Sequence, residues 1–136
     1  MTSKLDALTA VPSVVRITPD LESAARGRAA ASGVPFEDHH CETNSYFALL
    51  AALDLGHRDV CLVAGYRVAD LADWSRDPHV WLYIEGQHIE TSPGNAPVGK
   101  RYMEAWRLVP GPDLDRTMQR QYQTIVTDLA GWPSER

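Results

Sequence analysis

One cysteine, one histidine and one glutamate stand in an order that can carry out nucleophilic acyl chemistry. Cys41 ends the polar run Asp-His-His-Cys, His79 begins the segment His-Val-Trp-Leu-Tyr-Ile, and Glu90 stands in Ile-Glu-Thr-Ser-Pro. In such chemistry a cysteine sulfur attacks a carbonyl carbon, an imidazole moves the proton, and a carboxylate fixes the imidazole. The sequence therefore contains the three side-chain types of a cysteine-nucleophile triad.

The residues around Cys41 predict that it lies at the start of a helix. Apolar residues recur at near-helical spacing over residues 46–53 before Gly56 stops the pattern, and either Asp38 or Thr43 can serve as the N-cap. The first-turn N–H groups and the dipole of a helix favour negative charge at that end. We therefore expect the pKa of the Cys41 thiol to be lowered toward neutrality.

A hairpin is predicted to bring His79 and Glu90 together. If Glu85-Gly86 is a two-residue turn, Ile84 pairs with Gln87. His79 and Glu90 then become diagonal neighbours on one face, with backbones roughly 7–8 Å apart, a gap that a glutamate side chain can span. The same register puts four aliphatic residues on the opposite, buried face: Val80, Leu82, Ile84 and Ile89.

Three further residues are candidates for binding substrate. Asn44 shares a helix face with Cys41, as does Ser45, and is a candidate oxyanion donor. His40 either lines the mouth of a cleft or is an exposed loop residue. Trp81 is either part of a cleft wall or packs within the sheet.

The remaining pattern predicts an α+β fold with helices on one face of an antiparallel meander. Thr18-Pro19 starts a first helix that ends at Gly33, and a stripe of apolar residues predicts a last helix over residues 113–130. Residues 1–17 are expected to be loosely tied, with one strand within 11–17. The predicted strands cover residues 60–68, 79–84, 87–91 and 102–109, with a polar loop over 69–78.

The composition limits the class of protein. The chain has 136 residues, of which 44% are hydrophobic and 23% charged, as expected of one domain spanning residues 1–136. A net charge of −5 without a Lys/Arg block argues against nucleic acid or an anionic membrane as partner, and favours a small-molecule or peptide substrate. The oligomeric state stays open. No signal peptide or long apolar run is seen, so we expect a cytoplasmic protein.

The cysteines and histidines do not have the spacing of a metal site. Cys41 and Cys61 are expected to be free thiols, with Cys61 a structural residue of an apolar strand. His39 and His40 adjoin Cys41, but no Cys-x-x-Cys or His-x-x-x-His partner accompanies them. We therefore expect neither a metal nor another cofactor.

The motif region, residues 38–95, resembles the transglutaminase-like division of papain-like cysteine enzymes. The resemblance rests on Cys41 with Asn44 three residues later, on Gly65-Tyr66, on His79-Val80-Trp81, and on Glu90 followed by Thr-x-Pro. It implies a papain-like core in which Cys41 is the nucleophile, His79 the general base and acid, and Glu90 the residue that orients the imidazole.

Glu90 departs from the pattern of that superfamily, where aspartate usually stands. Asp77, two residues before His79, is an alternative carboxylate. The resemblance implies a hydrolase of the peptidase or amidase type that acts on an amide or ester through a thioester. An acyltransferase or cyclase of a biosynthetic pathway, or a binding module that keeps the fold without catalysis, remain alternatives.

Overall fold

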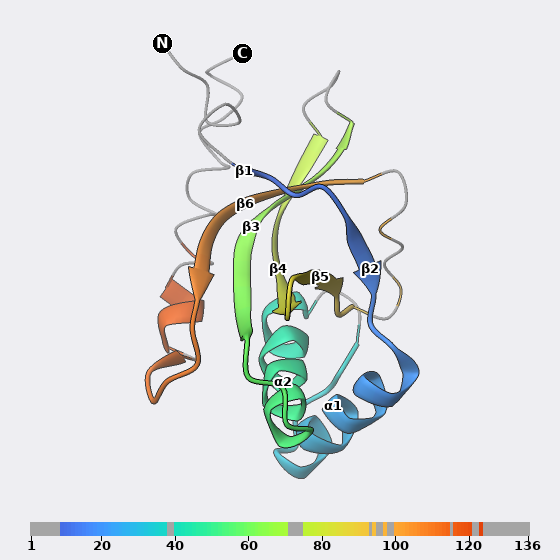
Figure 1. Ribbon diagram of the computed structural model, residues 1–136, viewed down its shortest axis with the longest axis vertical. Helices are drawn as coiled ribbons and strands as arrows, with labels where there is room; N and C mark the ends of the chain where they lie inside the picture. The colour runs from blue at the N-terminus through green and yellow to red at the C-terminus, as the bar shows by residue number, and fades with distance from the viewer. Residues whose placement is uncertain are drawn as a thin grey trace.

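Figure 1 shows the computed structural model of the chain, which describes residues 9–37, 40–70, 75–92, 94, 97, 100–114, 116–120 and 123. These residues form the helices α1 (Pro19–Ala31) and α2 (Cys41–Asp54) and the strands β1 (Thr9–Ala10), β2 (Val14–Arg16), β3 (Val60–Asp70), β4 (Ser75–Ile84), β5 (Gln87–Glu90) and β6 (Arg101–Leu108). The predicted α+β class is confirmed.

The helix α1 begins and ends where its sequence predicts. Thr18 is the N-cap, and its side-chain oxygen accepts a hydrogen bond from the Leu21 amide at 3.4 Å. Pro19 occupies the first helical position, where its missing N–H costs nothing. Beyond Ser32, Gly33 takes a φ of 71°, a left-handed conformation that glycine adopts without strain.

The helix α2 begins at Cys41, so the thiol lies in its first turn as predicted. The N-cap residue is His40, whose side chain makes no capping hydrogen bond. The expectation that Thr43 can cap the helix is wrong, because Thr43 is already its third residue; Asp38 lies outside the described residues. Gly56, with a φ of 95°, follows the end of the helix.

The hairpin of β4 and β5 has the predicted register. Ile84 pairs with Gln87 and Tyr83 with His88. Positive φ values of 48° at Glu85 and 93° at Gly86 match the two-residue turn that joins such strands. Side chains of the two strands therefore alternate between faces as expected.

The strands β3 and β4 are longer than predicted. They pair as far as Asp70 and Ser75, so most of the predicted polar loop over residues 69–78 is strand. Pro78 and the charged residues before it are typical of a loop, so the sequence pattern does not predict a strand here. Proline is tolerated there because the pairing of β4 with β5 ends at Leu82, which leaves one side of β4 unpaired at Pro78 among the described residues.

The order of the strands differs from the predicted antiparallel meander. The six strands lie in the order β1-β6-β3-β4-β5-β2, with β6 beside β3 and not beside β5. The sheet is also mixed, because β2 runs parallel to β5. The long connection from β5 to β6 permits this crossover, whereas a short hairpin would have forced neighbouring strands.

The sheet curls so far that one short N-terminal segment supplies the edge strand on both sides. β1 pairs with β6 at one edge and β2 with β5 at the other, and only residues 11–13 separate β1 from β2. An extended link of that length spans at most about 14 Å. Figure 1 shows this N-terminal segment crossing above the strands from β6 toward β5.

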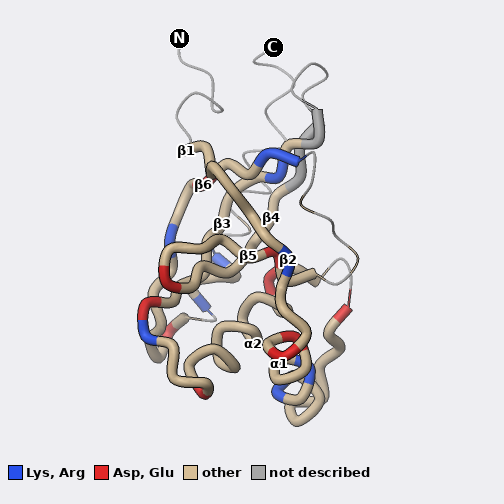
Figure 2. Tube along the Cα trace, turned by 45° about the vertical axis from the view of Figure 1, so that its right-hand side comes forward, with Lys and Arg blue, Asp and Glu red and all other residues tan. Residues whose placement is uncertain are grey.

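The two faces of the sheet carry two separate hydrophobic cores. The helix α2 packs on one face of the sheet, where residues such as Leu62, Val80 and Leu82 are buried, and α1 packs beside α2 (Figure 2). The other face holds a smaller cluster of Cys61, Val63, Trp81 and Tyr102, over which Val11 and Val14 of the N-terminal segment pack. Both faces are therefore covered.

Residues 114, 116–120 and 123 are helical and belong to the predicted last helix, whose other residues lie outside the described part. Leu114 and Met118 of its apolar stripe are buried in the core that the helices share with the sheet.

Candidate active site

His79 and Glu90 form a direct hydrogen bond. The Nε2 atom of His79 lies 2.7 Å from Oε1 of Glu90, and both residues are buried, with 4% and 1% of their surface exposed. The register of β4 and β5 is paired as far as Leu82 and Ile89, and the two side chains meet just beyond the last paired residues. The spatial relation predicted for the pair is present, and glutamate reaches the ring in place of aspartate.

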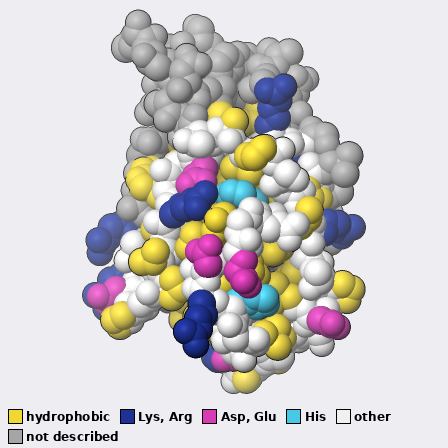
Figure 3. All heavy atoms as spheres, in the orientation of Figure 1, with side chains coloured by type: hydrophobic (Ala, Val, Ile, Leu, Met, Phe, Trp, Pro, Cys, Tyr) yellow, Lys and Arg dark blue, Asp and Glu magenta, His cyan; other side chains and the backbone are white. Residues whose placement is uncertain are grey.

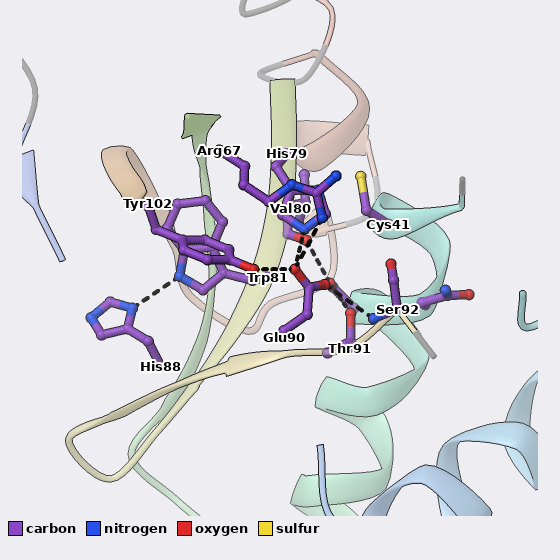
Figure 4. Close-up of polar contacts among 12 residues, drawn as sticks. Cys41, Arg67, His79, Val80, Trp81, His88, Glu90, Thr91, Ser92 and Tyr102 are labelled. Carbon is purple, nitrogen blue, oxygen red and sulfur yellow. Dashed lines mark hydrogen bonds and ion pairs between the residues drawn. The ribbon is translucent and has the colours of Figure 1, made fainter. Parts of the chain in front are cut away.

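Three other groups surround the Glu90 carboxylate (Figure 4). The Tyr102 hydroxyl donates to Oε1 at 2.6 Å, and the Ser92 amide donates to Oε2 at 3.1 Å. The Arg67 guanidinium lies 3.7 Å from Oε1. Burial alone raises the pKa of Glu90, but the hydrogen bonds from His79, Tyr102 and Ser92 outweigh it and hold the pKa below its usual value. Glu90 is thus an ionised carboxylate.

Tyr102 remains a hydrogen-bond donor. Burial and the neighbouring Glu90 carboxylate raise the pKa of its hydroxyl above the usual value. The ring also packs edge-on against Trp81, with centroids 5.2 Å apart. Tyr102 therefore donates to Oε1 of Glu90, the same oxygen that His79 contacts.

The start of α2 fits where β4 and β5 separate. The pairing of β4 with β5 ends at Leu82 and Ile89. Beyond this point, Ser45 of α2 bridges the two segments that continue from these strands. Its hydroxyl lies 3.0 Å from the Val80 carbonyl oxygen, to which it donates, and 2.7 Å from the Thr91 hydroxyl. Ser45 is fully buried. This bridge fixes the first turns of α2 against the end of the hairpin.

Cys41 lies beside Val80, the residue that follows His79. The backbone amide of Val80 faces the sulfur and acts to lower the thiol pKa, while Glu42 Oε2 accepts from the sulfur at 3.5 Å. Burial, with a smaller effect from Glu42, nevertheless raises the pKa to about 12. The expected lowering is therefore wrong for the free protein, because burial and a neighbouring carboxylate outweigh the helix start.

The sulfur and the imidazole belong to segments in contact, α2 and β4, without a hydrogen bond between the two side chains in the described structure. Figure 4 draws Cys41 at the start of α2, beside the segment of β4 that carries His79. Within the described part of the chain, no hydrogen bond joins the sulfur to the ring, and the Nδ1 atom of His79 has no hydrogen-bond partner. The acid and the imidazole are assembled, and the thiol stands next to them as a neutral group.

Asn44 holds the segment that precedes α2. Its Nδ2 atom donates to the Glu37 carbonyl at 2.8 Å, and its buried Oδ1 has no hydrogen-bond partner among the described residues. One of the two amide protons that could stabilise an oxyanion is thus already used. His40 is half-buried, with Nε2 3.4 Å from Glu37 Oε1.

Trp81 packs inside the sheet and lines no cleft in the described structure. It is fully buried between Tyr102 and the His79 ring, whose centroid is 6.1 Å away. Its Nε1 donates to Nδ1 of His88 at 2.9 Å, and burial lowers the pKa of His88. A neutral His88 is consistent with its role as acceptor. Of the two interpretations of Trp81, the structure supports packing.

No sequence pattern selects Tyr102, Arg67 or Thr91 as site residues. Tyr102 and Arg67 come from β6 and β3, which pair directly, with Arg67 opposite Tyr102. Only that pairing explains why both approach Glu90. The alternative acid Asp77 lies opposite Arg67 in β4, and its side chain is outside the described structure.

The described residues contain two free cysteines, Cys41 and Cys61, as expected. Within the same residues, no group of three or more His, Cys, Asp or Glu side chains could hold a metal ion. No described helix is long and apolar enough to cross a bilayer. Basic and acidic side chains are interspersed along the described trace and over the face in Figure 3, without a large basic patch.

Comparison of the chain with protein-family models, with curated proteins and with solved structures finds no match.

Proposed function

We propose that the protein is a cysteine-nucleophile hydrolase that cleaves an amide or ester through a thioester, with Cys41, His79 and Glu90 as its triad. The observation that carries the proposal is the buried 2.7 Å hydrogen bond between His79 and Glu90, next to Val80, whose backbone amide faces the Cys41 sulfur. The resemblance of residues 38–95 to transglutaminase-like enzymes also supports it.

The proposed reaction begins from a neutral thiol. The Cys41 sulfur attacks the carbonyl carbon while its proton passes to Nδ1 of His79. The tetrahedral intermediate then expels the amine or alkoxide, which takes the proton from Nδ1 as it leaves. Water attacks the thioester in the same manner, giving its proton to Nδ1, and the expelled sulfur recovers that proton. The ionised Glu90 stabilises the imidazolium that forms in each half-reaction.

Substrate binding must bring the sulfur and Nδ1 into hydrogen-bonding distance. Because the buried Cys41 sulfur contacts Glu42 and faces the Val80 amide, this approach must displace it from both neighbours. The amide of Val80 and the first-turn amides of α2 are the donors closest to the sulfur and can receive the developing oxyanion. Asn44 would contribute through its second amide proton.

The chief rival is a binding module that keeps the fold without catalysis. The buried, protonated state of Cys41 and its lack of a bond to His79 favour this rival. An acyltransferase or cyclase would share the thioester step, and would differ in forming product only when an amine acceptor is supplied.

Intact-mass analysis after treatment with 4-nitrophenyl acetate tests the proposal. We expect one acetyl adduct that decays with time, that is lost in Cys41→Ala and in His79→Ala, and that persists in Cys61→Ala. Cys61 is the matched control because it is also a buried thiol, with a pKa raised by burial to about 11. An adduct of equal yield in Cys41→Ala would reject the proposal in favour of the binding module.

A further inference from the structure

The ladder between β4 and β5 stops one step before it would join Val80 to Thr91. A two-residue turn closes on a hydrogen-bonded pair, and such pairs recur at every second residue of an antiparallel ladder. Counted from the turn, Leu82 with Ile89 is the second hydrogen-bonded pair, and Val80 with Thr91 would be the third. In the described structure the pairing ends at Leu82 and Ile89.

The strand on the other side of β5 is consistent with this count. The Ile17 amide, which follows β2, donates to the Glu90 carbonyl at 2.9 Å, so the carbonyl of Glu90 points away from β4. Backbone groups of successive residues in a strand point to opposite sides. Those of Thr91 therefore point toward β4, as a ladder pair with Val80 would require.

The Ser45 side chain takes the place of the missing ladder bond. In a continued ladder the Val80 carbonyl would accept from the Thr91 amide, and the Val80 amide would donate to the Thr91 carbonyl. Instead, the Ser45 hydroxyl donates to the Val80 carbonyl oxygen at 3.0 Å. Because this hydroxyl has a single proton, the Thr91 hydroxyl 2.7 Å away must donate to Ser45. All three residues are fully buried, so Ser45 is inserted between the two segments.

This insertion leaves the Val80 amide available to the nucleophile. The Val80 N–H faces the Cys41 sulfur and acts to lower the thiol pKa, whereas in a continued ladder the Thr91 carbonyl would bind it. Cys41 lies four residues before Ser45 in α2, on the same face of the helix. One helix face therefore supplies both the sulfur and the hydroxyl that replaces the ladder bond (Figure 4).

We propose that Ser45 is a positioning residue for the reaction at Cys41. By holding the segments of Val80 and Thr91 apart, it keeps the Val80 N–H directed at the sulfur. When the sulfur moves toward the imidazole, the same N–H is left to receive the oxyanion that develops on the substrate. This role in the reaction rests on the proposed hydrolase function, whereas the placement of the amide by Ser45 does not.

The NMR resonance of the Val80 amide tests its placement without any reaction. We expect Cys41→Ala to shift this resonance, because the amide loses the sulfur that it faces. In a Ser45→Ala background the ladder should close, and the resonance should no longer respond to Cys41→Ala. If Ser45→Ala does not fold, Ser45→Cys replaces it, since a thiol is a weak donor of similar size.

Thr91→Val is the matched control for the NMR experiment. It also removes the bond between Ser45 and Thr91, but it keeps the bond from Ser45 to the Val80 carbonyl. The response of the Val80 amide to Cys41→Ala should therefore persist in this background. No response in the wild type, or an undiminished response in the Ser45 variant, would overturn the proposal.

The rates of two reactions at Cys41 test the role of Ser45 in catalysis. Acetylation by 4-nitrophenyl acetate develops an oxyanion, whereas alkylation by iodoacetamide does not. Measured by intact mass in a Cys61→Ala background, the ratio of acetylation rate to alkylation rate should fall at least about tenfold in Ser45→Ala, as for a lost oxyanion donor. It should fall much less in Thr91→Val.

The outcomes separate this proposal from the hydrolase proposal. An unchanged ratio in Ser45→Ala would overturn the positioning role, because a loss of packing alone slows both reactions at Cys41 together. If the wild type forms no acetyl adduct on Cys41, the hydrolase proposal fails. The response of the Val80 amide then still decides whether Ser45 places that amide.

Discussion

The two halves of the candidate site are held in different ways. On the sheet side, Glu90 receives hydrogen bonds from His79, Tyr102 and the Ser92 amide, and all of these groups are buried. On the helix side, the Cys41 sulfur is buried beside Val80 and Glu42 and lacks a bond to the imidazole in the described structure.

Under the proposed hydrolase function, this contrast indicates which half is ready for chemistry before substrate arrives. Glu90 accepts hydrogen bonds from three buried groups, and this places the acid and the imidazole relative to each other. A neutral thiol needs no such partners and can reorient at small cost. We infer that the acid–base pair is preorganised, whereas substrate binding completes the contact with the nucleophile.

The largest expected effect comes from removing the carboxylate at the centre of the sheet side. Glu90→Ala leaves the Tyr102 hydroxyl, the Ser92 amide and the nearby Arg67 without their carboxylate, and we expect a loss of about 3–5 kcal/mol in the free energy of unfolding. Denaturant unfolding measures the loss. Cys41→Ala removes one small buried group and should cost about 1 kcal/mol. Equal losses in the two variants would contradict the contrast between the halves.

A smaller effect is expected from the backbone that supports the sheet side. Gly65 pairs with His79 on one side and lies at a bulge against β6 on the other. A Cβ atom at Gly65 would clash with the Met103 carbonyl oxygen, so Gly65→Ala should force β6 away and cost about 1–3 kcal/mol in unfolding free energy.

Gly27→Ala is the matched control for this substitution. Gly27 lies within α1 and a Cβ there would meet no atom within 4 Å. Alanine should stabilise the helix at that position by about 0.5–1 kcal/mol. If thermal unfolding shifted in the same direction for both variants, the bulge at Gly65 would not be the cause.

The sequence predicted the sheet side better than the helix side, for physical reasons. The relation of His79 to Glu90 is predictable because a two-residue turn fixes the strand register locally. The ends of α1 are predictable from the capping residues Thr18 and Gly33. Tyr102 could not be predicted as a partner of Glu90, because a long connection allows β6 to cross to β3. The expected lowering of the Cys41 thiol pKa is wrong because the burial of this residue depends on tertiary packing.

The pH dependence of stability should differ in sign between the two halves of the candidate site. The pKa of Glu90 is lowered in the folded protein, so its contribution is present above the unfolded carboxyl pKa near 4.5 and is lost as pH falls through the folded value. Unfolding free energies of wild type and Glu90→Gln, measured from pH 6 downward, should therefore converge in acid. A constant difference across this range would argue against an ionised Glu90.

Cys41 should produce a pH effect of the opposite sign. Its pKa is raised to about 12 in the folded protein, so unfolding releases a proton as pH rises through the usual thiol range near 9, and stability falls there. The same shift predicts that iodoacetamide labels Cys41 much more slowly in the native protein than in urea at pH 8, with a native rate that still increases above pH 9. Mass spectrometry of Cys61→Ala isolates the Cys41 rate. A native rate that levels off near pH 7 would mean that an imidazole already ionises the thiol in the free protein, and the proposed completion of the triad by substrate would then be unnecessary.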